Sequence, residues 1–230
     1  VRPVEKAWAQ QKQFVADASH ELKTPVTIIR GSVEALRDGV ISSPDDVRAY
    51  YNQILTETKG LQRLISDLLE LSRLQNVGFS LDMGDVDLRE LLGDVAMSAG
   101  ALCERKGVMF VCEEPKTGII IKGDYTRLRQ MLLAVVDNAV KFTEKGKTVT
   151  LSLEGRTVSI ADEGAGIAQE ELPHIFDRFH RAHGRMGGTG LGLAIASEVA
   201  KRHRIVIDVE SRMGQGTTFK FTFPDERREA

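Results

Sequence analysis

The chain has 230 residues, of which 42% are hydrophobic and 21 are glycine, a composition typical of folded proteins that excludes disorder over most of its length. Lys and Arg total 31 against 33 Asp and Glu, and the resulting net charge of −2 argues against a broad nucleic-acid-binding surface. Cys103 and Cys112 are the only cysteines, so we expect two reduced packing residues and no disulfide framework or metal site.

Residues up to about 76 predict two helices, because apolar residues recur in alternating steps of three and four. The two stripes consist of Val15, Ala18, Leu22, Val26, Ile29, Val33 and Leu36, then Val47, Tyr51, Ile54, Leu61, Ile65 and Leu68. A turn is expected over 39–44, where Ser43 can cap the second helix and Pro44 suits its first position. Leu64 and Leu71 flank the second stripe. Since two helices alone bury little apolar surface, we infer a homodimeric four-helix bundle.

From about residue 77 to residue 230, strands and helices alternate and most of the glycine occurs. We expect helices over 86–106, 124–142, 169–176 and 191–204, and strands over 108–111, 118–121, 148–153, 157–161, 205–210 and 217–222. Segregated helices and mostly antiparallel strands predict a two-layer α/β sandwich with its helices on one face of the sheet. The fold class is therefore α+β, with domains at 1–76 and 77–230.

His20 lies on the side of its predicted helix opposite the apolar stripe, with Asp17 and Thr24 on the same face and Glu21 beside it. Glu21 could accept the Nδ1 proton of His20 and leave Nε2 as a nucleophile. Pro25 can bend the helix one turn further on. The alternative for this patch is a solvated charged face with no chemical role.

Two glycine-rich stretches occur in the second half, and the first of them directly follows a predicted strand. In 162–167 (DEGAGI), a carboxylate at a strand end stands beside flexible backbone, which suits a purine amino group. In 187–193 (GGTGLGL), glycines open a helix, where backbone N–H groups and the helix dipole favour an anion. The spacing of this second stretch excludes a Walker-type loop. It does not directly follow a strand, which disfavours a Rossmann fingerprint. A plain strand-to-helix turn and a glycine-rich surface loop remain the alternatives.

Asn138 and Lys141 lie three residues apart on the helix expected over 124–142. They lie beside its expected buried stripe, which consists of Leu128, Leu132, Val135, Ala139 and Phe142. An amide oxygen and an ammonium on one face could serve Mg²⁺ and phosphate respectively. Taken alone, this pair favours the interpretation as a solvated helix face.

Together these segments resemble the sensor histidine kinases of two-component signalling over nearly the whole chain. The matching motifs are 14–25 (FVADASHELKTP, H-box), 138–143 (NAVKFT, N-box), 162–167 (first glycine box), 175–181 (IFDRFHR, F-box), 187–193 (second glycine box) and 216–219 (GTTF, closing strand). The resemblance implies a dimerisation and phosphotransfer hairpin joined to a Bergerat-type ATP-binding domain. Residues 1–13 would then end an upstream signalling helix.

By position, the resemblance implies that His20 is the phosphoacceptor, that Glu21 is the base orienting it, and that Thr24 positions water when the phosphorylated partner is hydrolysed. Asn138 would ligate Mg²⁺, Lys141 would meet phosphate and Asp162 would bond the adenine amino group of ATP. The other implied nucleotide-binding residues are Phe142, Gly164, Gly166, Arg178 (at the γ-phosphate), Gly188, Thr189, Gly190, Leu191, Gly192 and Thr218.

The implied partners are a response-regulator receiver domain and a second copy of the chain, with no nucleic acid. No apolar run is long enough to span a membrane and the chain begins at Val1, so we expect the cytoplasmic portion of a longer protein anchored in the cell membrane. The pattern departs from the family at Ala134, where a second asparagine often occurs, and at Arg204, where a glycine often occurs and we expect a different turn. Rival interpretations are an ATPase of the gyrase, mismatch-repair or Hsp90 type and a non-catalytic dimeric scaffold.

Overall fold

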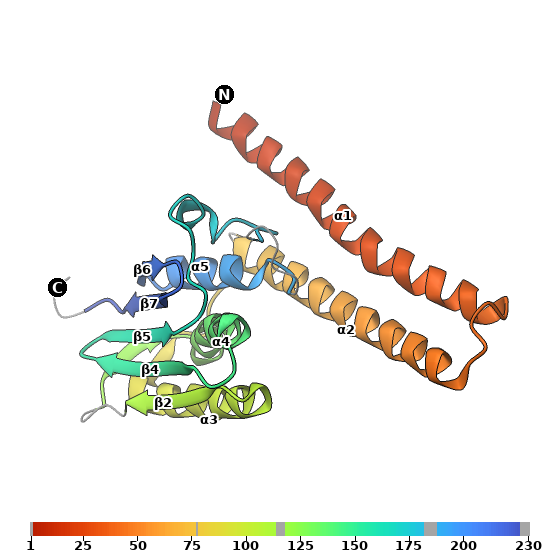
Figure 1. The fold of residues 1–230 in the computed structure, drawn as a ribbon. Coiled ribbons are helices and arrows are strands. Elements are labelled where there is room, and N and C mark those ends of the chain that lie inside the picture. Colours follow the sequence, from red (N-terminus) through yellow and green to blue (C-terminus); the bar gives the residue numbers. More distant parts are fainter. Residues whose placement is uncertain (1, 77, 114–117, 182–187, 226–230) are drawn as a thin grey trace.

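The computed structural model describes residues 2–76, 78–113, 118–181 and 188–225 (Figure 1). Its first part is an antiparallel hairpin of two long helices, α1 (Arg2–Arg37) and α2 (Pro44–Gln75). The turn between them forms as predicted: the Ser43 hydroxyl accepts a hydrogen bond from the Asp46 N–H at 3.2 Å, and Pro44 occupies the first turn of α2. α1 continues through Pro25 as one helix. Within the described residues, no helix is long and apolar enough to cross a membrane.

The apolar stripe of the hairpin is largely uncovered. Val15, Val26 and Val33 are 56%, 49% and 48% exposed, although their spacing marks them as an interior seam. Leu64 and Leu71, predicted to flank that seam, lie buried instead, on the side of α2 that packs against the second half of the molecule. One face of α2 therefore packs into the core of the second half, whereas the apolar stripe of the hairpin stays accessible to another surface.

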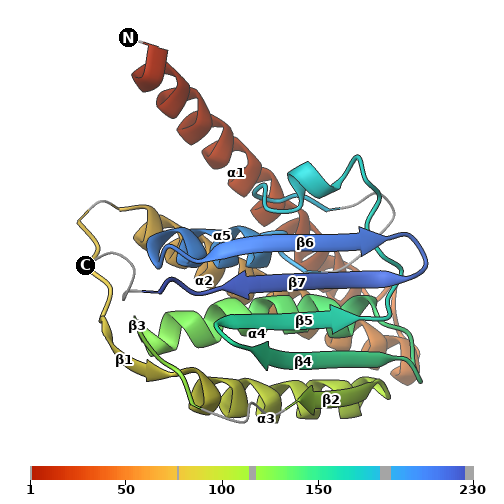
Figure 2. The same cartoon turned by 90° about the vertical axis from the view of Figure 1, so that its left-hand side faces the viewer.

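The second half is a two-layer α/β sandwich (Figure 2). Its helices are α3 (Leu88–Lys106), α4 (Tyr125–Phe142) and α5 (Gly192–Arg202). Its main sheet has the order β2-β4-β5-β7-β6, with strands β2 (Met109–Glu113), β4 (Thr148–Glu154), β5 (Thr157–Asp162), β7 (Gly216–Thr222) and β6 (Val206–Arg212). The pair β2–β4 is parallel and the other pairs are antiparallel. The helices cover one face of this sheet, so the predicted fold class is confirmed.

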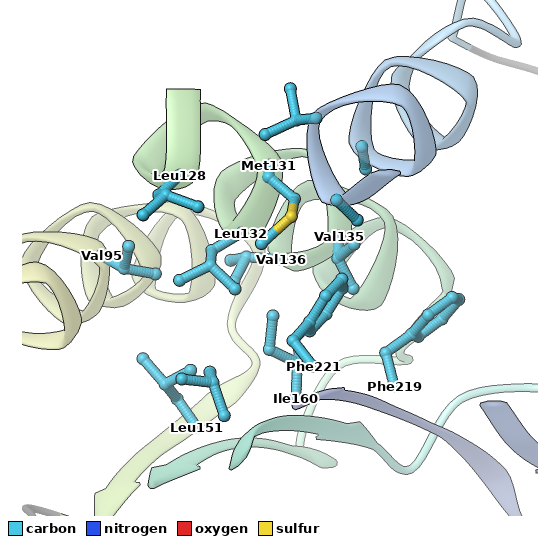
Figure 3. Packing of buried hydrophobic residues seen from close by; sticks show 14 of the residues in the cluster. Val95, Leu128, Met131, Leu132, Val135, Val136, Leu151, Ile160, Phe219 and Phe221 are labelled. Atoms are coloured by element: carbon cyan, nitrogen blue, oxygen red, sulfur yellow. The ribbon is translucent and has the colours of Figure 1, made fainter. Parts of the chain in front are cut away.

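The core lies between α4 and the sheet (Figure 3). Leu128, Leu132 and Val135 of the predicted stripe are fully buried and meet side chains from the strands, among them Leu151 and Phe221. α4 begins at an Asp124 cap, whose side chain accepts a hydrogen bond from the Arg127 N–H at 3.1 Å. This packing fixes which face of α4 turns away from the core and toward the binding site.

Three predicted elements differ from the structure. Val86 belongs to a short strand, β1 (Gly84–Asp87), because it pairs with Ile121 of β3 (Ile120–Gly123), and the helix begins only after the Asp87 cap. The predicted helix over 169–176 is reduced to a 3₁₀ turn, η1 (Leu172–His174), in which Pro173 supplies no backbone N–H. Arg204 adopts a left-handed conformation (φ +56°), the one that glycine favours, so the expected change of turn is not found.

The connection between the two halves is held in place. Arg202 of α5 donates to the carbonyl oxygens of Asn76 (2.8 Å) and Phe79 (2.9 Å), and its guanidinium lies 5.7 Å from the Phe79 ring centroid. Arg127 of α4 lies over the same ring at 5.5 Å and forms an ion pair with Glu70 of α2. The contacts seen here therefore join α2, the connection and both helices α4 and α5 into one unit.

Candidate nucleotide-binding site

A cavity of about 320 Å³ lies at the end of α4, within the size range of small-ligand sites. The predicted site residues on its wall are Asn138, Lys141, Phe142, Asp162, Gly166, Gly188, Thr189, Gly190 and Gly192. They come from α4, the end of β5, the glycine-rich loop and the first turn of α5. These predicted residues, which lie up to 54 positions apart in the sequence, thus converge on one pocket.

Asp162 ends β5 at the wall of this cavity, and two glycines let the chain turn tightly behind it. Its Oδ1 accepts a hydrogen bond from the Gly164 N–H at 2.8 Å. A Cβ at Gly164 would lie 2.6 Å from that oxygen, and one at Gly166 (φ +70°) would lie 2.0 Å from the Arg212 carbonyl oxygen. Only glycine fits either position without displacing backbone or the carboxylate, which accounts for the predicted 162–167 motif in terms of packing.

The polar face of α4 brings an amide, an ammonium and a carboxylate to the cavity. Asn138 and Lys141 are half-buried, and Asp137 lines the same wall. Burial lowers the pKa of Lys141, the nearby Asp137 carboxylate opposes this, and the cations of Arg181 and Lys106 add to the lowering. Lys141 Nζ lies 4.8 Å from the Phe142 ring centroid. The wall therefore offers positive charge beside oxygen ligands.

The glycine-rich loop forms the next part of the wall. Gly188 and Gly190 have φ of +92° and +70°, and a Cβ at Gly190 would lie 2.8 Å from the Phe179 backbone. The Phe179 N–H donates to the Gly190 carbonyl at 2.9 Å, which ties the loop to the preceding F-box segment. Leu191 is fully buried in the core and anchors the start of α5 without lining the cavity. Gly187 and residues 182–186 fall outside the described residues.

The remaining predicted residues lie beside the cavity or on the hairpin. Gly164 supports Asp162 from behind, and Thr218 lies in β7 beside Ala161, next to an adjacent shallow groove. Arg178 does not line the cavity: its guanidinium lies 4.8 Å from the Phe14 ring centroid on α1. His20 is exposed on α1, and the Thr24 hydroxyl donates to the His20 carbonyl at 3.4 Å.

Contacts between the F-box segment and α1 bring the two halves together near His20. Arg181 donates to Glu21 Oε2 at 2.5 Å, and Arg181 also lines the cavity. The Phe14 and Phe179 rings stack with centroids 6.0 Å apart. One cation thus reaches both the cavity and the residue next to the exposed imidazole.

Two regions of the chain match known families, in an order that parallels this division. Residues 10–77 match the His Kinase A (phospho-acceptor) domain, and residues 123–227 match the histidine kinase-, DNA gyrase B- and HSP90-like ATPases. The chain is 34% identical over 223 residues to sensor histidine kinase YkoH of Bacillus subtilis (strain 168). This alignment covers 94% of the chain and 48% of YkoH. The chain belongs to the sensor histidine kinases.

Solved structures share the architecture of this kinase. Full-length ShkA in complex with AMPPNP is 30% identical with a TM-score of 0.66, over 92% of this chain and 45% of ShkA. Histidine kinase ThkA in complex with the response regulator TrrA has a TM-score of 0.79 at 23% identity, over 98% of this chain and 65% of ThkA. The second likeness is one of fold. The kinase chain spans about half the length of YkoH.

The residues at the cavity fit a magnesium nucleotide. Mg²⁺ in nucleotide sites is held by one or two protein oxygens together with phosphates and water. Asn138 and Asp137 supply such oxygens, and Lys141 and Arg181 supply positive charge for phosphate. Among the described residues of the kinase, no cluster of three or more His, Cys, Asp or Glu side chains could hold a metal ion.

Sequence reasoning missed the contributions of the hairpin to the cavity. Arg63 and Asp67 of α2 line it, and the Thr189 hydroxyl donates to Asp67 Oδ2 at 2.6 Å. Neither residue belongs to a recognisable motif. The apolar stripe of α2 predicts which face packs against α1, but it does not predict which face contacts the second half. No local signal could therefore have identified Arg63 and Asp67.

Proposed function

We propose that this kinase transfers the γ-phosphoryl group of Mg·ATP to His20 and then to an aspartate on a response-regulator receiver domain. The observation that carries the proposal is the pairing, on one chain, of a cavity built from the ATPase motifs with an exposed histidine on the matched phospho-acceptor helix. Phosphoryl transfer depends mainly on positioning and neutralisation of charge, and the two halves divide those tasks. The domain division near residue 76 is part of the same proposal.

In the nucleotide site, Asp162 would accept a hydrogen bond from the adenine amino group at the end of β5. Lys141 would contact phosphate, Asn138 would ligate Mg²⁺, and Gly188 and Gly190 would let the backbone approach the phosphates closely. Bound Mg²⁺ would neutralise charge that develops on the phosphate oxygens. The support is their common placement on one cavity wall.

On the hairpin, His20 Nε2 would attack the γ-phosphorus. The new N–P bond forms as the P–O bond to ADP breaks, and Glu21 accepts the Nδ1 proton of the imidazole. Glu21 lies one residue from His20 and is half-buried, and its ion pair with Arg181 has to open for this role. Arg178 reaches the γ-phosphate only if it leaves the Phe14 ring.

A homodimer would cover the exposed stripe of the hairpin, including Val15, Val26 and Val33. We also propose that Thr24 positions water for hydrolysis of the phosphorylated regulator. The Thr24 side chain is exposed one turn beyond His20, where its hydroxyl could reach a docked partner. The proposal of a response regulator as partner is supported by the structure of ThkA, which is in complex with the response regulator TrrA.

Incubation with Mg·ATP labelled at the γ-phosphate tests the proposal. We expect acid-labile, base-stable label on the chain, which indicates a phosphoramidate. His20→Ala should lose the label but keep nucleotide binding, and Asp162→Asn should lose both. Absence of label in the wild type, or label retained by His20→Ala, would refute the assignment. Release of inorganic phosphate alone would favour an ATPase of the gyrase or Hsp90 type.

A further inference from the structure

The glycine-rich loop of the cavity is fastened to helix α2 at Asp67. The Thr189 hydroxyl donates to Asp67 Oδ2 at 2.6 Å and accepts from the Leu191 N–H at 3.3 Å. Asp67 and Thr189 both line the cavity. A carboxylate from the hairpin therefore holds the loop that would receive the phosphates of the nucleotide.

The position of Asp67 is unfavourable for its charge. The side chain is half-buried, and burial raises the pKa of Asp67, while the hydrogen bond from Thr189 and the Arg63 cation act in the opposite direction. A nucleotide brings further negative charge into the same cavity. Because like charges in a partly dehydrated cavity repel strongly, the ionised carboxylate and a bound phosphate disfavour each other.

The titratable groups around Asp67 come from several elements. Those sharing its cavity or the adjoining one are Arg63 on α2, Tyr125, Arg129, Asp137 and Lys141 on α4, Asp162 at the end of β5, Glu171 just before η1, and His180 and Arg181 in the F-box segment. α5 contributes Gly192, Leu193 and Ile195, which do not titrate. Among these groups, Asp67 is the one whose hydrogen bond reaches the glycine-rich loop from the hairpin.

We propose that Asp67 is a positioning residue that weakens nucleotide binding, because it holds Thr189 against α2 and opposes the incoming phosphates. The inference rests on the proposed assignment of this cavity to ATP. Loading of nucleotide then releases the loop from the hairpin. Since coupling is reciprocal, any shift of α2 that breaks the Asp67–Thr189 bond strengthens nucleotide binding by the same factor.

Removing this bond leaves the two halves otherwise joined. Glu70, about one turn further along α2, pairs with Arg127, and Leu64 and Leu71 are buried against the second half. Asp67→Asn keeps an oxygen acceptor for Thr189 and removes the charge, whereas Asp67→Ala removes both. The two variants separate repulsion from tethering.

Calorimetric titration of the full chain with Mg and a non-hydrolysable ATP analogue tests the proposal. We expect Asp67→Asn to lower the Kd about fivefold and Asp67→Ala to lower it about tenfold, within the usual range of coupling between sites. Asp208→Asn, the same change at an exposed position on β6 outside the cavity, should leave the Kd within about twofold of the wild type. Unchanged or weaker binding in both Asp67 variants would overturn the inference.

A pH series supplies a readout that a purely structural role would not move. As pH falls, Asp67 becomes protonated and neutral, so the Kd ratio of wild type to Asp67→Asn should approach one; a constant ratio would contradict the charge effect. In labelling kinetics, KM for ATP should fall more than kcat changes. If no variant binds nucleotide, the assignment of the cavity fails and the inference fails with it; binding without an Asp67 effect removes the inference alone.

Discussion

The two halves of the kinase handle apolar surface in opposite ways. In the second half, α4 and the sheet bury their side chains against each other, and Leu132 and Phe221 are completely enclosed. In the hairpin, residues with an equally regular apolar spacing, such as Val26, remain about half exposed. Regular apolar spacing therefore indicates that a helix face is buried, but it does not indicate whether the same chain or another molecule buries it.

The largest effect is expected from breaking the self-contained core. Leu132→Ala removes buried methyl groups where the neighbours cannot close the gap, and should lower the free energy of unfolding by about 2–5 kcal/mol. Leu55→Ala, the same change at an exposed position of α2, should cost less than about 1 kcal/mol. Denaturant unfolding of the two variants measures the difference, and similar losses would contradict the contrast.

The next effect concerns the uncovered stripe. If a second copy covers it, Val26→Asp places a charge in the seam and should raise the dimer dissociation constant about a hundredfold, equivalent to about 2.7 kcal/mol. The control is Arg30→Asp, at an exposed position four residues further along α1, which should raise the dimer dissociation constant less. Sedimentation equilibrium measures both. A wild-type chain that stays monomeric at high concentration would remove the basis for the dimer.

A smaller effect is expected where the two halves touch near His20. The stacked rings of Phe14 and Phe179 should couple by about 1 kcal/mol in a double-mutant cycle of alanine variants. Hydrogen exchange along α1 should increase in either single variant. Additive effects would show that the two halves do not hold this contact in solution.

Acidification should weaken the second half through His203, which is buried between α5 and the start of α4. Nδ1 donates to the Val199 carbonyl (2.8 Å) and Nε2 accepts from the Asp124 N–H (3.0 Å), so both nitrogens are occupied in the neutral ring. Burial lowers the pKa of His203 below its usual value. The unfolded chain therefore binds the proton first, and the free energy of unfolding should fall as pH drops below about 6.5.

Unfolding measured between pH 7.5 and 5.5 tests this pH dependence. His203→Gln should be less stable at neutral pH, because a flexible amide replaces the buried, fully hydrogen-bonded ring, but it should lose part of the pH-dependent slope. A variant with the full slope of the wild type would assign the effect to other groups.

The smallest effect is expected at Arg204, whose left-handed conformation favours glycine. Arg204→Gly should raise the free energy of unfolding by about 0.5 kcal/mol, because it relieves the Cβ clash at some cost in chain entropy. The rise in Tm is the measurement. A clear fall in Tm would mean that contacts of the arginine side chain outweigh the backbone strain.

Most of the fold followed from local patterns. The Ser43–Pro44 cap, the stripe of α4 and the glycines around Asp162 each act within a few residues, and all were predicted. One misplaced element depended on a distant partner: Val86 forms a strand because it pairs with Ile121. The residues of α4 and β5 that line the cavity belong to motifs recognised in the sequence, but Asp67 does not, because its position at the cavity arises from the packing of one half against the other.

Locating the phosphoryl group tests the central claim most directly, namely that the second half supplies the nucleotide and the hairpin supplies the acceptor. After incubation with Mg·ATP, the full chain would be digested at alkaline pH and its peptides fragmented by mass spectrometry. We expect a single phosphorylated peptide, carrying the group on His20. A phosphoryl group on another residue, or ADP produced while His20 stays unmodified, would contradict the account.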